Sequence, residues 1–230
     1  MHTPGVSASS PARVEARVRA AVPRADEPFS LRALGPADIL AVKALCIKAF
    51  PIEYPSSWYE EVVSGHLISR GIFTPDGKLV ALIIAECKLL IQCNAEDRDI
   101  LGDVSSEVVY ILSLAVDSEH RRKGFASRLL LHLLDLARQS LYSPKAVFLH
   151  VLSSNHSAIA FYNRHGFQHH DTLSRYYRLP DGYGDGRTYV LYMNGGWRPY
   201  AWKDVCRSLS YFFCSPFSRL LKQNAQIHTA

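Results

Sequence analysis

YILSLAV (residues 110–116) runs directly into DSEHRRKGFASRLL (117–130), and this stretch decides the fold. Its first part is rich in β-branched, aliphatic and aromatic residues, which favour a buried strand. A basic turn follows, with Arg121, Arg122 and Lys123 before Gly124. The Leu- and Ala-rich pattern after the turn is typical of a helix. The stretch therefore predicts a strand, a turn and a helix in direct succession.

The turn is suited to binding a diphosphate. Small residues at Gly124 and Ala126 let a phosphate approach the backbone. The first amides of the helix lack intrahelical partners and carry the positive end of the helix dipole. The sequence has neither a P-loop motif nor a Gly-x-Gly-x-x-Gly that follows a strand. Three glycines at 182, 184 and 186 precede TYVLYM (188–193), and we interpret them as part of a flexible hairpin loop.

Composition indicates one domain with extensions. The chain has 230 residues, of which 48% are hydrophobic and 20% charged, which is enough for a sizeable core. Residues 1–28 are rich in Ala, Arg, Pro and Ser, so we predict disorder there; their acidic residues argue against a transit peptide. The domain is expected at 29–196 and a tail at 197–230. Five cysteines without disulfide or metal spacing indicate reduced thiols in the cytosol. No apolar stretch reaches the roughly 18 residues that span a bilayer.

The remaining patterns predict an α/β (α+β) fold with a mixed sheet. Strands are expected at 29–34, 66–74, 78–87, 107–116, 146–152, from 167 onward and at 188–193. Helices are expected at 38–50, 57–64, within 117–142 and at 157–164. We interpret residues 89–105 as a polar insertion and the Tyr-rich residues up to 187 as a long loop.

The turn at 121–126 resembles the pyrophosphate loop of the GNAT acetyltransferase superfamily. Four longer stretches are similar to a Golgi-associated N-terminal acetyltransferase of this superfamily: FPIEYPSSWY (50–59), YILSLAV (110–116), LHVLSSNHSAIAFYNRHGF (149–167) and VLYMNGG (190–196). The resemblance implies a GNAT fold, in which a central sheet of about seven strands is splayed between two parallel strands. It also implies about four flanking helices, acetyl-CoA as co-substrate and no metal.

Two titratable residues interrupt otherwise apolar strands, Tyr110 in VVYILSL and His150 in VFLHVLS. In isolation, a strand tyrosine is more often a core residue and a lone histidine a hydrogen-bonding one. The resemblance instead implies that they are the catalytic pair. An α-amine has a pKa near 8, so a base acting through a water is sufficient. We expect His150 to be the base and Tyr110 to orient the water or protonate the leaving thiolate.

The resemblance also assigns binding roles. The coenzyme is expected to contact Leu114, Ala115, Val116, Arg122, Lys123, Gly124, Phe125, Ala126, Ser127, Asn155, Tyr162, Asn163, Arg164 and His165. The first substrate residues are expected to contact Phe50, Pro51, Ile52, Glu53, Tyr54, Leu112 and Tyr177. FPIEYP is also compatible with a rigid link between helices. The histidines at 165, 169 and 170 lack acidic or cysteine partners at suitable spacing, which disfavours a metal site.

The tail combines basic and apolar residues. From 198 to 222 it has five basic residues and one acidic residue, a net charge of +4 out of +5 for the chain. Val205, Leu209, Phe212 and Phe213 follow helical spacing before a break at Pro216. This pattern predicts amphipathic helices that lie on a membrane surface. The alternative is a helix that folds back on the enzyme domain.

Together these features predict an N-terminal acetyltransferase for Met-starting proteins, including transmembrane proteins with cytosolic N-termini. The resemblance implies direct attack in a ternary complex and peripheral attachment to the cytosolic face of the Golgi. The expected partners are protein N-termini and a membrane surface; a homodimer is compatible, and no role for nucleic acid is implied. Lysine (histone) or small-amine acetylation remains an alternative, as does a non-catalytic CoA-binding membrane adaptor.

Overall fold

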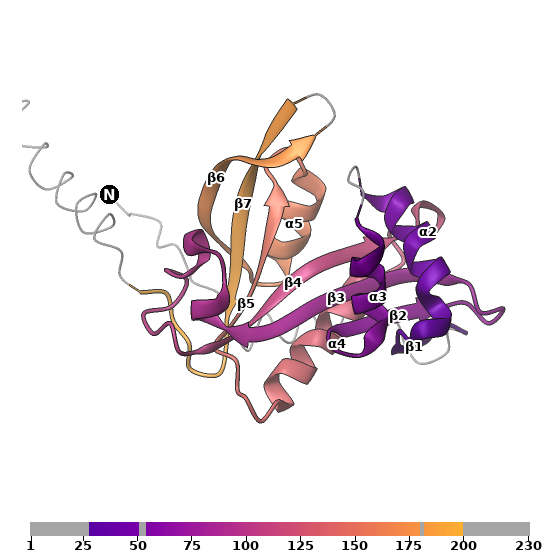
Figure 1. The fold of residues 1–230 in the computed structure, drawn as a ribbon, viewed down its shortest axis with the longest axis horizontal. Coiled ribbons are helices and arrows are strands. Elements are labelled where there is room, and N and C mark those ends of the chain that lie inside the picture. Colours follow the sequence, from indigo (N-terminus) through magenta and orange to yellow (C-terminus); the bar gives the residue numbers. More distant parts are fainter. Residues whose placement is uncertain (1–27, 51–53, 180–181, 200–230) are drawn as a thin grey trace, which may run out of the picture. The chain divides into compact units, whose positions relative to one another are not determined.

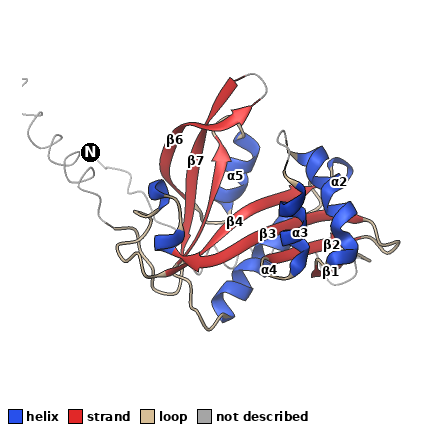
Figure 2. Cartoon of the chain, in the orientation of Figure 1, coloured by secondary structure: helices blue, strands red, loops and turns tan. Residues whose placement is uncertain are grey.

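The computed structural model describes residues 28–50, 54–179 and 182–199. Within these residues, seven strands form one sheet in the order β1-β2-β3-β4-β5-β7-β6. The strands are β1 (Ser30–Ala33), β2 (Ile68–Phe73), β3 (Leu79–Leu89), β4 (Glu107–Val116), β5 (Ala146–Leu152), β6 (Gln168–Leu179) and β7 (Gly182–Tyr192). The α-helices are α2 (Ile39–Ala49), α3 (Ser56–Ser64), α4 (Phe125–Gln139) and α5 (His156–Arg164) (Figures 1 and 2). The predicted mixed sheet and the four flanking helices are confirmed.

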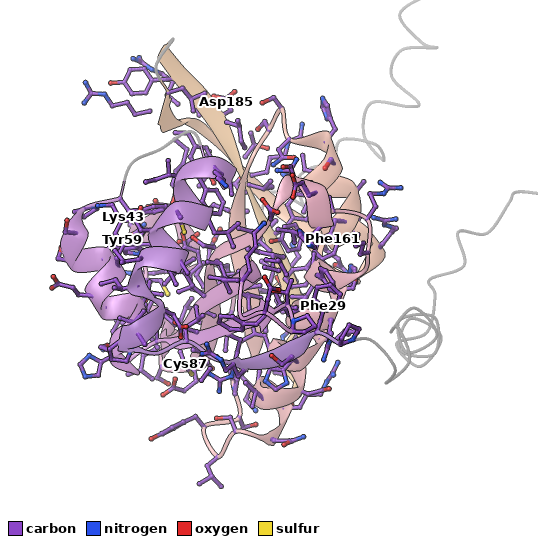
Figure 3. All side chains as sticks on the ribbon, turned by 90° about the vertical axis from the view of Figure 1, so that its right-hand side faces the viewer. Phe29, Lys43, Tyr59, Cys87, Phe161 and Asp185 are labelled. Atoms are coloured by element: carbon purple, nitrogen blue, oxygen red, sulfur yellow. The ribbon has the colours of Figure 1, made fainter. Side chains whose placement is uncertain are left out.

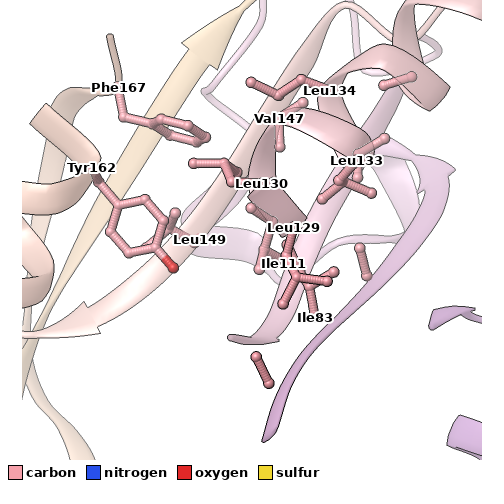
Figure 4. Packing of buried hydrophobic residues seen from close by; sticks show 14 of the residues in the cluster. Ile83, Ile111, Leu129, Leu130, Leu133, Leu134, Val147, Leu149, Tyr162 and Phe167 are labelled. Atoms are coloured by element: carbon pink, nitrogen blue, oxygen red, sulfur yellow. The ribbon is translucent and has the colours of Figure 1, made fainter. Parts of the chain in front are cut away.

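The helices cover the two faces of the sheet separately. On one face, the leucines of α4 at 129, 130, 133 and 134 pack against β3, β4 and β5 (Figure 4). Tyr162 of α5 joins the same cluster. On the other face, α2 and α3 form a second apolar cluster with β3 and β4. Figure 3 shows Lys43 of α2 and Tyr59 of α3 on one side of the molecule and Phe161 of α5 on the other.

The sheet divides between β4 and β5. These strands are parallel and pair only from Val108 with Ala146 to Ile111 with Leu149. Beyond this point β4 remains paired with β3 as far as Val116, and β5 remains paired with β7 as far as Leu152. The two halves therefore diverge, as Figure 1 shows. Residues 112–116 of β4 therefore do not pair with β5, although one edge of their backbone faces it.

A β-bulge in β4 changes which residues face α2 and α3. Ile84 pairs with Ser113 and Ala85 with Ile111, so Leu112 is the extra residue of β4. Ile111 and Leu114 both pack on the α4 side, whereas Leu112 packs on the α2–α3 side. The bulge thus shifts the alternation by one residue, directly beyond the last pair of the β4–β5 ladder.

The 89–105 segment is more ordered than a polar insertion. It contains two short 3₁₀ helices, Leu90–Gln92 and Ala95–Asp97. Its buried apolar residues form a third cluster with the start of β4, β5 and β7: Leu90, Cys93, Ile100 and Leu101. The segment is therefore part of the core and covers the β4–β5 end of the sheet.

The predicted Tyr-rich loop up to 187 is wrong. These residues extend β6 and β7 into a long antiparallel pair, with register irregularities between His169 and Asp171 and between Leu173 and Tyr177. Gly182, Gly184 and Gly186 are all strand residues, and Gly184 and Gly186 make room for neighbouring side chains. A Cβ at Gly184 would lie 2.6 Å from Leu152 Cδ1.

Cys46, Cys87 and Cys93 are free. Cys206 and Cys214, the extension at 1–27 and the tail from 200 onward lie outside the described residues. The chain divides after Trp197 into two units, and only residues 198 and 199 of the second are described. Among the described helices, none has the length and apolar character to cross a membrane.

Candidate active site

The two residues predicted to be catalytic lie in contact where β4 and β5 diverge. The Tyr110 hydroxyl is 3.0 Å from His150 Nδ1. Tyr110 pairs with Phe148 across the parallel ladder, so His150 lies one side-chain step further on the same face of β5. Phe148 also stacks on the Tyr110 ring, with ring centroids 4.7 Å apart. The alternation of both strands thus directs the two polar side chains toward one another.

A buried carboxylate fixes the other side of the histidine ring. Asp97 Oδ1 lies 2.8 Å from His150 Nε2, and both side chains are 2% exposed. A neutral imidazole has one N–H donor and one acceptor, and a carboxylate only accepts. Nε2 therefore carries the proton that is donated to Asp97, and Nδ1 presents a lone pair to Tyr110. This is the tautomer in which His150 can accept a proton on the tyrosine side.

Sequence reasoning missed Asp97. It lies 53 positions from His150 along the chain, in the segment interpreted as a polar insertion. One signal was present: apolar residues flank the acidic NAEDRD run on both sides, at Leu90, Ile91, Ile100 and Leu101. Such flanks indicate a segment that packs, and a carboxylate inside a packed segment needs a partner.

Tyr176 is a second residue that the sequence did not single out. Its hydroxyl is 3.0 Å from the same His150 Nδ1, and the two ring centroids are 4.7 Å apart. Gly186 of β7 makes this position accessible, because a Cβ there would lie 3.0 Å from Tyr176 Cβ and Cδ1. Since Nδ1 has one lone pair, the Tyr110 and Tyr176 hydroxyls compete for it.

Burial keeps both hydroxyls protonated at neutral pH. It raises the pKa of Tyr110 well above its ordinary value near 10, and the neighbouring Tyr176, Tyr177 and Asp97 add to the effect. Burial, with Asp97 next, raises the pKa of Tyr176 to about 12. Neither tyrosine is therefore a phenolate base near pH 7. His150 Nδ1 is the acceptor of this group, and the tyrosines donate to it or relay a proton.

The residues predicted to contact substrate border the same face of the sheet. Tyr54 stacks on Trp58 with centroids 4.0 Å apart, and its hydroxyl is 3.3 Å from Ser113 Oγ. Leu112 packs on the α2–α3 side, two residues beyond Tyr110 in the alternation of β4. Tyr177 lies beside Tyr176, with ring centroids 5.1 Å apart. Burial raises the pKa of Tyr177, and Tyr176 and Tyr54 add to this rise.

Of the remaining predicted substrate residues, Phe50 contacts Tyr54 edge-on, with centroids 6.1 Å apart. Pro51, Ile52 and Glu53 lie outside the described residues. Trp58 and Ser113 were not predicted from the sequence. Tyr54 precedes α3, whose N-cap is Pro55, and Trp58 lies in the first turn of the helix, so helical spacing does not relate the two rings.

The predicted phosphate turn has the expected geometry. Arg122 has φ 63° and Gly124 φ 82°, so the turn alternates into the left-handed region and presents its amides together. The first described helical bond of α4 runs from Arg128 N to Gly124 O, which leaves the amides of residues 125–127 at the helix start. The basic side chains at 121, 122 and 123 are exposed.

Neighbouring contacts hold this turn in place. Arg121 Nε donates to Val116 O at 3.3 Å. His120 Nδ1 lies 3.0 Å from Asp117 Oδ2, and this contact lowers the pKa of Asp117. The Phe125 side chain is buried against Phe29, so only its backbone is available to a ligand. The α4 amides suit a pyrophosphate, and the β4 backbone from 112 to 116 suits an extended amide-containing arm.

The α5 residues predicted to contact the coenzyme differ in exposure. Asn155 caps α5 by accepting from Ala158 N at 3.1 Å. Tyr162 is buried, which raises its pKa, whereas Asn163 and Arg164 are exposed. His165 Nδ1 contacts Phe161 O at 2.8 Å. The other two histidines considered for a metal also have separate neighbours: His169 contacts Thr172, and His170 contacts Asp99.

Comparison with known proteins agrees with this geometry. The model of the acetyltransferase (GNAT) family matches residues 43–167. N-alpha-acetyltransferase 60 of Xenopus tropicalis is 42% identical over 187 residues, covering 78% of this chain and 76% of the relative. The Danio rerio protein of that name is 41% identical over 176 residues, covering 75% and 73%.

Solved structures give the same result. The crystal structure of Arabidopsis thaliana NAA60 in complex with a bisubstrate analogue has a TM-score of 0.66 and 27% identity. The match covers 73% of this chain and 99% of that chain. The same protein in complex with acetyl-CoA matches with a TM-score of 0.66 and 26% identity. Acetyl-CoA is therefore the co-substrate, as predicted. The chain belongs to the acetyltransferase (GNAT) family, in its branch of acetyl-CoA-dependent N-terminal protein acetyltransferases.

Proposed function

We propose that this N-terminal acetyltransferase acts on proteins that begin with Met, by direct attack of the α-amine in a ternary complex. The observation that supports the mechanism is the contact of Asp97 with His150 Nε2, which leaves the unprotonated Nδ1 of His150 facing the Tyr110 and Tyr176 hydroxyls. A buried base fixed in one tautomer, behind protonated tyrosines, is suited to draw a proton from a bound amine.

The proton path follows from the contacts of His150. Asp97 occupies His150 Nε2, and the Tyr110 and Tyr176 hydroxyls each lie 3.0 Å from Nδ1, so the hydroxyls are placed between the base and the substrate. An ordered water takes the proton of the α-ammonium. Tyr110 accepts a proton from this water and passes its own to His150 Nδ1. Asp97 then stabilises the imidazolium through Nε2.

The coenzyme side works mainly through backbone groups. Acetyl-CoA supplies the activated thioester carbonyl that the amine attacks; the C–N bond forms, the C–S bond breaks, and coenzyme A leaves as a thiolate that takes up a proton. Asp117 N donates to Val80 O on β3, so alternation directs the Ala115 amide to β3 as well and the amides of Leu114 and Val116 away from it. The Leu114 and Val116 amides donate to the carbonyl oxygen and the pantetheine arm. The turn at 122–127 holds the pyrophosphate. Holding the amine and the thioester in line supplies much of the rate.

The preference for Met follows from the aromatic and apolar residues around Tyr54. Tyr54, Trp58, Leu112 and Tyr177 present aromatic and aliphatic groups on the Tyr110 side of the sheet. A flexible, polarisable thioether packs well against such aromatic rings. Glu53, which lies outside the described residues, is proposed to receive the α-ammonium before it loses its proton.

A peptide panel tests this assignment. It contains Met-starting and Ser-starting peptides with free α-amines, and an Nα-blocked peptide with an internal lysine. Transfer to the free Met-starting peptide is expected to dominate; transfer only to lysine overturns the substrate class. Equal rates for Met and Ser overturn the Met preference. Tyr54→Phe keeps the ring and is the control for Tyr54→Ala, which is expected to raise KM for Met peptides.

We further propose that residues 197–230 attach the enzyme to the cytosolic face of a membrane, the Golgi, where cytosolic N-termini of transmembrane proteins are substrates. Support comes from the tail's net charge of +4 beside Trp and Phe residues. Full-length protein is expected to co-sediment with anionic vesicles, and chain ending at Gly196 to remain in solution with its activity intact. A full-length protein that stays in solution refutes the attachment. The same samples in sedimentation analysis show whether a homodimer forms.

A further inference from the structure

An ion pair on β3 lies beside the proposed catalytic tyrosine. Glu86 is the Cα partner of Tyr110 on β4, and Lys88 is the partner of Val108. Residues directly opposite in an antiparallel pair project from the same face, so both side chains share the face of Tyr110. Lys88 Nζ is 2.7 Å from Glu86 Oε2 and 5.4 Å from the centroid of the Tyr110 ring.

The position of this pair is unusual for β3. All residues from 79 to 85 are buried and apolar, and the first charged side chain appears opposite Tyr110. The Lys88 side chain is 19% exposed and that of Glu86 37%. An ammonium that is largely removed from water is costly unless it is paired. Glu86 supplies that pairing, so the cation is held at the tyrosine rather than extended into solvent.

We propose that Lys88, held by Glu86, is a positioning residue for proton transfer: its ammonium fixes the Tyr110 ring and neutralises Glu86, so that this carboxylate does not hold the bound substrate amine in its protonated form. The ring face attracts the cation, which restricts the direction of the hydroxyl. A carboxylate near the amine favours its protonated form, and the ammonium in contact with Glu86 offsets this effect. This inference rests on the Tyr110–His150 proton path proposed above.

Other charged and titratable groups near Tyr110 do not replace this cation. Asp97 is committed to His150, and Arg98 Nε donates to Cys93 O at 3.0 Å. Glu107 accepts from Cys87 Sγ at 3.3 Å. Among the described residues, the cation over the Tyr110 ring belongs to Lys88. The remaining groups that face this region are Tyr54, Cys93, Glu96, His150, Tyr176 and Tyr177.

The test is the pH profile of kcat, because kcat reports groups in the substrate complex. Lys88→Met keeps the stem but removes the charge and leaves Glu86 uncompensated. Coulomb's law at about 8 Å and an effective dielectric constant of about 20 gives an acid-limb shift of roughly 1.5 pH units upward. In the double variant Lys88→Met, Glu86→Gln no carboxylate is left uncompensated, so a shift of about half a unit or less is expected. Lys88→Arg keeps the charge and is expected to match the parent.

Two results overturn the inference. One is an acid limb of Lys88→Met that coincides with the parent; the other is a kcat lowered by the same factor at every pH, which indicates a structural role. Thermal unfolding of each variant checks that it is folded. Tyr110→Phe and His150→Ala are measured in parallel. If both retain full activity, the proton path itself fails; if both lose activity while Lys88→Met is normal, only the role of Lys88 fails.

Discussion

Asp97→Asn is the substitution that most directly tests the catalytic group. The amide is isosteric with the carboxylate, but it carries no charge and can donate to His150 Nε2, which would favour the tautomer with a proton on Nδ1. The parent contact is 2.8 Å between two side chains that are 2% exposed. At an effective dielectric constant of about 20, it stabilises an imidazolium by up to about 6 kcal/mol. General-base catalysis as a whole contributes about 10²- to 10⁴-fold, which limits the loss.

We therefore expect kcat of Asp97→Asn to fall about 10²- to 10³-fold, with KM for acetyl-CoA nearly unchanged. The assay is steady-state acetylation of a Met-starting peptide, with thermal unfolding to verify the fold. Asp99→Asn is the matched control: Asp99 lies in the same segment and contacts His170 at the same 2.8 Å, but its side chain is 69% exposed. The kcat of this control is expected to stay within about twofold of the parent, because exposed ion pairs contribute little.

A double-mutant cycle separates the histidine from the fold. In a His150→Ala background, Asp97→Asn is expected to add little, because residues that act as a unit are not additive. A folded Asp97→Asn protein with kcat within threefold of the parent refutes the reasoning. The reasoning is also refuted if Asp97→Asn lowers kcat in the His150→Ala background by the same factor as in the parent.

Three further predictions follow from the geometry. Gly124→Asp places a strained, negative residue at φ 82° in the phosphate turn and is expected to weaken acetyl-CoA binding at least about 100-fold by calorimetry; unchanged affinity contradicts the turn's role. Gly186→Ala adds a Cβ 3.0 Å from Tyr176 and is expected to lower kcat to the level of Tyr176→Phe, within about tenfold of the parent; a parental rate shows that Tyr176 is dispensable. Because burial raises the pKa of Tyr176 to about 12, the folded state retains a proton that the unfolded state loses near pH 10. This contribution to stability is therefore full below about pH 10 and is lost as pH rises toward 12. The free energy of unfolding, measured in urea at each pH, should fall less steeply with pH for Tyr176→Phe than for the parent.

The elements that the sequence predicted correctly are those with a local signal. YILSLAV and the Leu-rich residues of α4 each carry their own period, so strand, turn and helix follow without knowledge of the rest of the chain. Tyr110 and His150 were visible for the same reason, as polar residues in apolar strands. Residues 171–187 failed because their Tyr, Gly and Arg content matches a loop, while the pairing that makes them strands is a contact between β6 and β7.

The missed site residues have a common cause. Asp97 reaches His150 only after the 89–105 segment packs on the sheet; the apolar residues that flank NAEDRD indicate that the segment packs, but not which residue Asp97 contacts. Tyr176 and Tyr177 are adjacent, and alternation would normally decide which faces the histidine. The register shifts between Leu173 and Tyr177, so the alternation of β6 does not predict which of the two tyrosines faces His150.

The coenzyme contacts and the proton path constrain the sequence in different ways. The coenzyme is held by backbone amides of β4 and α4, so the chain needs only small residues and the correct φ at positions such as Gly124. The proton path is held by side chains from four segments, with Tyr110 on β4, His150 on β5, Asp97 in the 89–105 segment and Tyr176 on β6. Because these contacts share no residue with the phosphate turn, substitutions in the path should change kcat while acetyl-CoA affinity is preserved. A variant of Asp97 or Tyr176 that lost both together would show that the two halves are coupled through the sheet, and the separation argued from the diverging strands would not hold.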